Sequence, residues 1–215
     1  GNYNVSIGTR NLNENDSGSK NTSIGENALQ NNISGSNNTA SGFEALKLNE
    51  TGEYNTANGY QALNDNVSGD NNVAVGSFSL TNNTGYGNTA VGRGTLNNNI
   101  NGNYNTVIGF DADVGSPSLT NATAIGYQAQ ATTDNVIQLG NADVTYLYTT
   151  GSLAMSSDRR LKENIVRTPY GLEEVLKLNP VSYQFISNGL GQLGFIAQEV
   201  QKLVPEVVVG TEVDI

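Results

Sequence analysis

The chain of 215 residues contains no cysteine, no histidine and no tryptophan. These absences exclude disulfide frameworks, Cys/His zinc sites, haem ligation by His and the Ser-His-Asp triad. Lys and Arg number 10 against 20 Asp and Glu, and the formal net charge is −10. Phosphate binding needs clustered Lys and Arg, so we expect no nucleic acid or anionic membrane as a partner. No apolar run approaches the roughly 20 residues of a membrane span. We therefore expect no membrane insertion, and we also expect no cofactor and no bound metal.

Asparagine, glycine and a short repeat dominate the part of the chain before Thr150. A phrase of the type N-T-A-V-G recurs with a constant period of about seventeen, apart from one step that is shorter by one. Its glycines are Gly8, Gly25, Gly42, Gly59, Gly76, Gly92, Gly109 and Gly126. Leucines follow at Leu12, Leu29, Leu46, Leu63, Leu80 and Leu96, and a second glycine recurs at Gly18, Gly35, Gly52, Gly69, Gly85 and Gly102. A fixed short period predicts that each unit is one coil of a stacked solenoid.

Each unit has the features of β structure. N-T-A-V-G alternates polar and apolar residues as a short half-buried strand does, and the A-L pair after the glycine supplies a second inward contact. We interpret N-x-S-G and N-x-T-G as turns in which glycine accepts a positive φ. The glycines and asparagines of one unit would cost several kcal/mol in a helix. The predicted fold is therefore mostly β.

The sequence alone leaves the number of chains open. A coil has only four or five small inward residues, so it is marginal alone, and three coils around one axis would bury both apolar rows. NATAIGYQAQATTDNVIQLGNA, residues 121–142, resembles the β-roll repeats of trimeric autotransporter adhesin heads, with the glycine spacing shortened to fourteen. The resemblance implies a trimeric β-solenoid or β-roll fibre, which a small α+β domain follows.

One asparagine row keeps a single position of the repeat: Asn4, Asn21, Asn38, Asn55, Asn72, Asn88 and Asn105. The row could bind ligands or ions through its amides, or form a ladder in which stacked side chains hydrogen-bond to one another and to nearby turns. We favour the ladder. The carboxylates of Glu26, Glu44, Glu53, Asp65 and Asp70 drift in position, so we interpret them as surface charges rather than as a glycosidase pair.

The composition changes after Ser157, which 30 of the 33 asparagines precede. Helical spacing predicts a helix over 172–178 that ends before Pro180, and AQEVQKLVP predicts a second helix closed by Pro205. Strands are predicted over 181–186, in GQLGFIA and in EVVVG. The pattern indicates a compact α+β module.

SSDRRLKENI, a helix ending in L-N-P, the strand VSYQF and GQLGFIAQEVQKLVPEVV together resemble the C-terminal intramolecular chaperone of phage endosialidases, tail fibres and neck appendages. That family is also classed as autoproteolytic. The resemblance covers Ser156 to about Val209. It implies that the domain trimerises, drives folding of the preceding β-fibre, and then cuts the chain between Ser157 and Asp158.

The chemistry of such a cut needs an activated serine. A serine hydroxyl requires a base, and without histidine a lysine is the obvious substitute. Lys162 lies five residues after Ser157, and the resemblance implies that it is the general base of a Ser-Lys peptidase acting once on its own chain. Its pKa would have to be lowered by partial burial or by Arg159 and Arg160. The alternative is a basic segment that pairs with Glu163.

Three segments are predicted: a repeat shaft over 1–120, an adhesin-head-like β-roll and connector over 121–156, and a chaperone domain over 157–215. The predicted function is a virion tail fibre or spike for host attachment, with its own homotrimer and a host glycan or protein receptor as partners. The alternatives are an extracellular or cell-surface bacterial trimeric adhesin and a tailspike glycan depolymerase, which would need a carboxylate pair facing one groove. Gly1 begins in mid-repeat, and the family continues past the position of Ile215, so we expect an excerpt.

Overall fold

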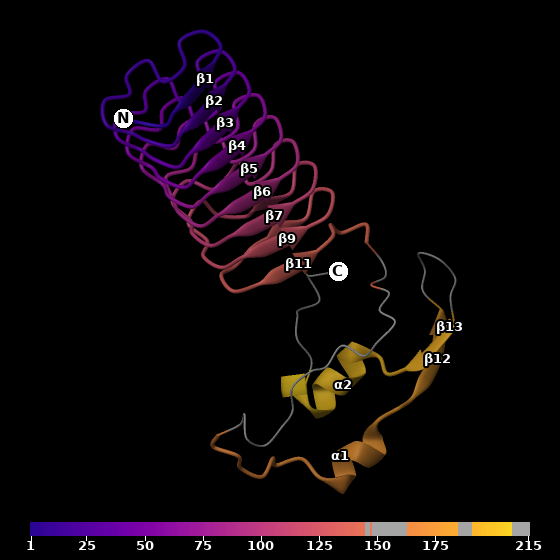
Figure 1. The fold of residues 1–215 in the computed structure, drawn as a ribbon. Coiled ribbons are helices and arrows are strands. Elements are labelled where there is room, and N and C mark those ends of the chain that lie inside the picture. The colour runs from indigo at the N-terminus through magenta and orange to yellow at the C-terminus, as the bar shows by residue number, and fades with distance from the viewer. Residues whose placement is uncertain (145–146, 148–162, 185–190, 208–215) are drawn as a thin grey trace. The chain divides into compact units, whose positions relative to one another are not determined.

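A computed structural model describes residues 1–144, 147, 163–184 and 191–207. The chain divides into two compact units, Gly1–Tyr148 and Thr149–Ile215. Figure 1 shows that the described part of the first unit is built of short strands and loops, whereas the second contains the α-helices.

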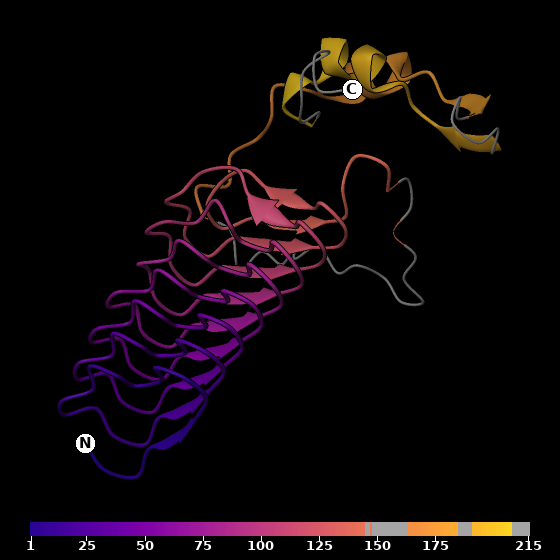
Figure 2. The same cartoon turned by 90° about the horizontal axis from the view of Figure 1, so that it is seen from above.

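The first unit is a β-solenoid of about eight turns, which confirms the predicted β-solenoid with coils of about 17 residues. Its main sheet has nine parallel strands in chain order, and each strand lies beside the next along the stack (Figures 1 and 2). The strands are β1 (Val5–Ile7), β2 (Thr22–Ile24), β3 (Thr39–Ser41), β4 (Thr56–Asn58), β5 (Val73–Val75), β6 (Thr89–Val91), β7 (Thr106–Ile108), β9 (Thr123–Ile125) and β11 (Ile137–Leu139).

The pairing register follows the repeat. Thr39 of β3 pairs with Thr56 of β4, one full repeat later. The last coil is shorter, because Thr123 of β9 pairs with Ile137 of β11. A second parallel pair, β8 (Asp113–Val114) with β10 (Gln130–Ala131), accompanies these last coils.

The core of the solenoid lies inside one chain. The middle residue of most strands is fully buried, as are the alanine and leucine of the A-L pairs, for example Ala45 and Leu46. The fully buried leucines are Leu29, Leu46, Leu63, Leu80 and Leu96. Our expectation that such coils would need partner chains to bury both apolar rows is therefore wrong for these residues, because the coils above and below cover the open sides of each coil.

The two glycine rows have different causes. Gly42, which ends the N-T-A-S-G phrase, has φ of +137°, and a Cβ there would lie less than 3.0 Å from the carbonyl oxygen of Gly59 in the next coil. Gly52 belongs to the second row and does not have a positive φ, so our turn interpretation is wrong on this point. Its Cβ would collide with the side chain of Asn49 and the carbonyl of Gly69, so close approach requires the second glycine.

The second unit contains α1 (Leu172–Lys177), the antiparallel pair β12 (Val181–Gln184) and β13 (Gly191–Gly194), α2 (Ala197–Leu203) and the 3-10 helix η2 (Pro205–Val207). Both predicted helices are present. The strand predicted over 181–186 is present over 181–184, and its last two residues lie outside the described residues. The strand predicted in GQLGFIA is present over 191–194 but ends before Ala197, which begins α2. The predicted strand EVVVG is wrong where the structure describes it, because the ring of Pro205 restricts φ and the chain starts η2 there. None of the helices among the described residues has the length and apolar character needed to cross a membrane.

Candidate functional site

The predicted cleavage site, Ser157–Asp158, and the predicted base Lys162 lie outside the described residues. Their roles therefore stay predictions. Glu163, the alternative partner of the basic segment, is described and exposed.

The described part of the second unit leaves its apolar side chains uncovered. No residue of α1 or α2 is buried. Leu172 and Leu176 of α1 are 72% and 75% exposed, and Leu193 of β13 is 85% exposed. Helix stripes of this kind normally face a core, and none of the described residues of this unit covers these apolar surfaces.

A hollow of about 190 Å³ lies beside α2, lined mainly by apolar groups. Leu178, Phe195, Val200 and Leu203 contribute to its walls. Such a hollow has room for an apolar side chain but presents no catalytic grouping among the described residues.

Polar contacts form before the start of α1 and between this segment and η2. The Tyr170 hydroxyl donates a hydrogen bond of 2.8 Å to Glu206 of η2, which raises the pKa of Tyr170. The Gly171 N–H donates to Glu174 at 2.7 Å and lowers the pKa of that carboxyl. The Glu174 carboxylate stabilises the N-terminus of α1, and the Tyr170–Glu206 bond joins the residue before α1 to η2. We interpret both contacts as structural.

In the first unit, the asparagine row forms a buried ladder, as we favoured. The Asn55 side-chain oxygen accepts a 2.9 Å bond from the N–H of Asn72, and the Asn55 side-chain N–H donates at 2.7 Å to the carbonyl of Gly69. The same pattern runs from Asn4 to Asn105. We call this row the first amide ladder. It ends at Ala122, whose N–H bonds to Asn105 where the coil shortens.

A second row, which we did not predict, lies three residues before the second glycine in most coils. Its members are Asn15, Asn32, Asn49, Asn66, Asn83 and Asn99. Asn66 donates through one side-chain nitrogen to Asn49 at 2.9 Å and to the Gly69 carbonyl at 2.8 Å. The Gly69 carbonyl thus accepts from both rows. The buried side-chain amides bond to one another and to backbone groups of neighbouring coils. The two ladders therefore stabilise the stacking of the coils, and their amides are not free to bind a ligand.

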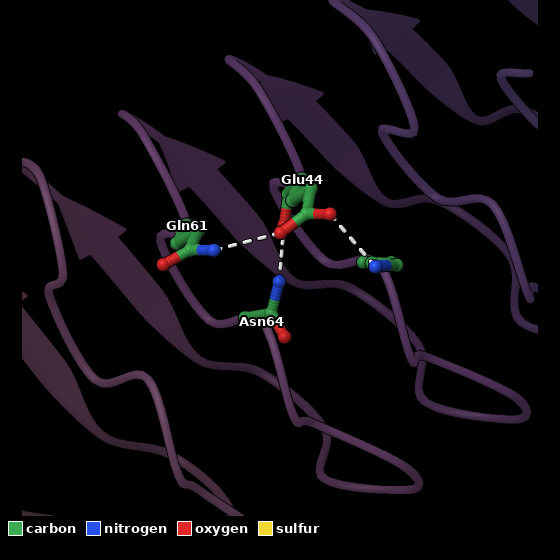
Figure 3. Close-up of polar contacts among 4 residues, drawn as sticks. Glu44, Gln61 and Asn64 are labelled. Atoms are coloured by element: carbon green, nitrogen blue, oxygen red, sulfur yellow. Dashed lines mark hydrogen bonds and ion pairs between the residues drawn. The ribbon is translucent and has the colours of Figure 1, made fainter.

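One carboxylate of the solenoid has a defined set of partners. Glu44 accepts from Lys47 and from Gln61 of the next coil, both at 2.7 Å, and its backbone oxygen accepts from Asn64 at 2.9 Å (Figure 3). The bonds from Lys47 and then Gln61 hold the pKa of Glu44 below its ordinary 4.5. The Glu44 side chain is only 15% exposed, so this cluster joins two coils rather than facing a substrate.

Asp113, at the start of β8, has the opposite shift. Burial raises its pKa above the ordinary 3.8, although its carboxylate accepts from the N–H groups of Val114 at 2.8 Å and Asn98 at 3.1 Å. The Asp113 carboxylate therefore serves as the hydrogen-bond acceptor for two backbone N–H groups. Among the residues that the structure describes, no group of three or more His, Cys, Asp or Glu is placed to hold a metal ion.

The two carboxylates predict opposite acid responses. Folding favours the ionised form of Glu44. Its contribution to the free energy of unfolding is therefore present above pH 4.5 and is lost as pH falls through the pKa of Glu44 in the folded protein. Folding favours the protonated form of Asp113, so stability falls as pH rises from 3.8 through its folded pKa. Melting curves between about pH 3 and 6 should show that Glu44→Gln reduces the loss of stability as pH falls. Asp113→Asn should reduce the loss of stability as pH rises. Glu50→Gln is the charge-loss control; equal pH slopes in all three variants would contradict the assignment.

Comparison with known proteins places the second unit in context. Residues 157–209 match the family model described as chaperone of endosialidase. No curated protein matches the chain. The matched segment begins at Ser157 and spans the described α1, β12, β13 and α2. The match and the solenoid together support a chaperone module that follows a repeat structure.

Proposed function

We propose that this protein is a homotrimeric fibre or spike of a phage or another virus, that it serves host attachment, and that it is located in the virion. Its C-terminal module assembles three chains and then cuts the chain between Ser157 and Asp158. The proposal depends on one observation: a β-solenoid precedes, in the same chain, a segment that matches the chaperone of endosialidase.

The exposure of the second unit supports assembly. Leu172, Leu176 and Leu193 are each more than 70% exposed in the single chain, whereas the leucines of the A-L pairs in the solenoid, such as Leu46, are fully buried. Apolar surfaces left open on one chain are covered when copies associate. The module therefore has the character of a domain that completes its core in an oligomer.

The regularity of the solenoid explains the need for such a module. Coils of nearly identical sequence can be aligned one whole coil out of register with little local cost, so wrong alignments are many and nearly equal in energy. A trimeric clamp after the last coil fixes the three chains in one alignment. Removing the clamp afterwards turns thermodynamic stability into kinetic stability.

Cleavage would use groups that the chain possesses. The Ser157 oxygen attacks the carbonyl carbon of the Ser157–Asp158 peptide bond while Lys162 takes up the hydroxyl proton. The C–N bond then breaks as Lys162 gives the proton to the Asp158 nitrogen, and water hydrolyses the acyl ester, which leaves a carboxyl group on Ser157 and a new amino terminus on Asp158. The masses of the two products together exceed the intact mass by one water molecule.

The test is the intact mass of the purified chain beside Ser157→Ala and Lys162→Ala. The wild type should split between residues 157 and 158, and both variants should lose at least about 99% of the cleavage. Lys177→Ala removes a lysine of the same module and should still cleave. If every chain stays whole yet trimeric, the module is a registration clamp and the Ser-Lys assignment is wrong.

A further inference from the structure

The outward side of the main sheet carries no charge. We define the outer sheet face as the first and third residues of its nine strands. These are Val5, Thr22, Thr39, Thr56, Val73, Thr89, Thr106, Thr123 and Ile137, with Ile7, Ile24, Ser41, Asn58, Val75, Val91, Ile108, Ile125 and Leu139. Every charged residue of 1–144 lies elsewhere, although the chain carries a net charge of −10. Ile24, Val75 and Ile108 on this face are 37% to 40% exposed.

All nine aromatic residues of 1–144 border this face along the chain. One row follows the strands by two or three residues, and the other precedes them by two or three. The following row is Phe43, Tyr60, Phe78, Phe110 and Tyr127, and the preceding row is Tyr3, Tyr54, Tyr86 and Tyr104. They are 36% to 84% exposed, and the buried core contains no aromatic ring. Exposed aromatic rings around a centre without charge are typical of protein interfaces.

Neighbouring rings already contact one another, two pairs by stacking and two pairs edge to face. Phe43 and Tyr60 lie 5.2 Å apart between centroids with an interplanar angle of 12°, and Phe110 and Tyr127 lie 6.0 Å apart at 28°. The Arg93 guanidinium covers Phe110 at 5.5 Å. Stacking on a sugar ring requires an open ring face. Since a stacked neighbour occupies one face of Phe43, Tyr60, Phe110 and Tyr127, these pairs suit an apolar protein surface better than a glycan.

We infer that the outer sheet face and its aromatic rows form the surface through which copies of this chain pack against one another along the solenoid. The inference rests on the proposed trimeric fibre and names the face that a neighbouring copy meets. Copies that each carry a net negative charge repel one another least where uncharged faces meet, and this face meets that condition.

The size of the face agrees with this role. Nine strands spaced about 4.8 Å apart run for about 40 Å, and seven residues at about 3.3 Å each give a width of about 20 Å. The resulting footprint of roughly 800 Å² is close to what one partner buries in a stable complex. When parallel copies lie in one register, the same strands stand at the same height along the solenoid. The faces of neighbouring copies can therefore meet over their whole length.

The chain lacks cysteine, so a crosslink formed through a single introduced cysteine shows that this position lies near the same position in another copy. Val75 on the face and Val67 away from it have similar exposures, 37% and 39%. A short bismaleimide should crosslink copies of the Val75→Cys chain at least about tenfold more than copies of Val67→Cys. Adding Ile24→Glu to Val75→Cys should remove most of the crosslink, whereas adding Ile33→Glu, at a site of matched exposure, should not. Circular dichroism checks that all variants fold.

The outcomes separate this inference from the proposed function. If the chain is trimeric in solution but Val75→Cys stays uncrosslinked and reactive, the inference is wrong, while a trimer held by the C-terminal module survives. If Val67→Cys crosslinks instead, another side of the solenoid is the interface and the inference fails. A chain that is monomeric by light scattering overturns both.

Discussion

Gly59→Ala is expected to lower the free energy of unfolding of the solenoid by more than about 3 kcal/mol. Gly59 has φ of +146°, and a Cβ there would lie less than 3.0 Å from the carbonyl oxygen of Gly76 in the next coil. The colliding atom belongs to the backbone, so relief requires the coils to separate and the 2.8 Å bond from the Gly76 N–H to Asn58 to lengthen. Denaturant unfolding followed by circular dichroism measures the loss.

The control for this prediction is Gly115→Ala in the same solenoid. Gly115 does not have a positive φ, and a Cβ there would come no closer than 3.4 Å to Thr132. We expect a change within about 1 kcal/mol, since an added Cβ mainly restricts the unfolded chain. Equal losses in the two variants would show that coil spacing adapts to a side chain and that the close approach is not required.

Asn55→Asp is expected to be as damaging at neutral pH. The change replaces the N–H donor that faces the Gly69 carbonyl with an oxygen, and it places a charge at a position that is 1% exposed. A buried charge that no cation neutralises, with a carboxylate oxygen facing the Gly69 carbonyl oxygen, should cost about 3 to 5 kcal/mol. Unfolding curves measured at several pH values test this.

Acid should partly rescue this variant. The folded state disfavours the charged form, so the folded pKa of the new carboxyl is raised, and stability relative to wild type improves as pH falls through that pKa. The protonated carboxyl can donate to the Gly69 carbonyl. Asn82→Asp, at an exposed position, should show neither the loss nor the rescue. A loss that is independent of pH would indicate a packing defect rather than a misplaced charge.

The repeat period predicted most of the solenoid. The constant period and the alternating N-T-A-V-G phrase placed the strands, and the A-L pair located the core, because both depend on short-range patterns that recur in every coil. The pattern also predicted the first amide ladder. The second ladder was missed, although its signal is visible: an asparagine such as Asn49 precedes each of several second glycines by three residues.

Other features depend on contacts between coils and not on local pattern. The second glycines were assigned to positive φ, but they are required because an asparagine side chain and the carbonyl of the next coil lie where a Cβ would stand. The core leucines adopt φ of about 50°, as Leu46 does, which bulky residues rarely do. Stacking and full burial impose this conformation, so residue propensity could not indicate it.

The candidate site was predicted from resemblance more than from physical pattern. The match over residues 157–209 supports the chaperone module, whereas Ser157 and Lys162 lie outside the described residues and remain predictions. The predicted strand EVVVG is wrong over Glu206 and Val207, because the prediction rested on β propensity alone and Pro205 restricts φ at the start of η2. Its other residues lie outside the described part of the chain.

The amide ladders make the length of the solenoid a modular quantity. Between Asn4 and Asn105 neighbouring coils exchange the same ladder hydrogen bonds, so removing residues 39–55 would join Asn38 to Thr56 and leave the two coils on either side with partners of the same kind. Recombination between the nearly identical coding segments could therefore add or delete whole coils without a new folding solution. Each such event would change the reach of the protein by one strand spacing, about 4.8 Å, so its length evolves in discrete steps.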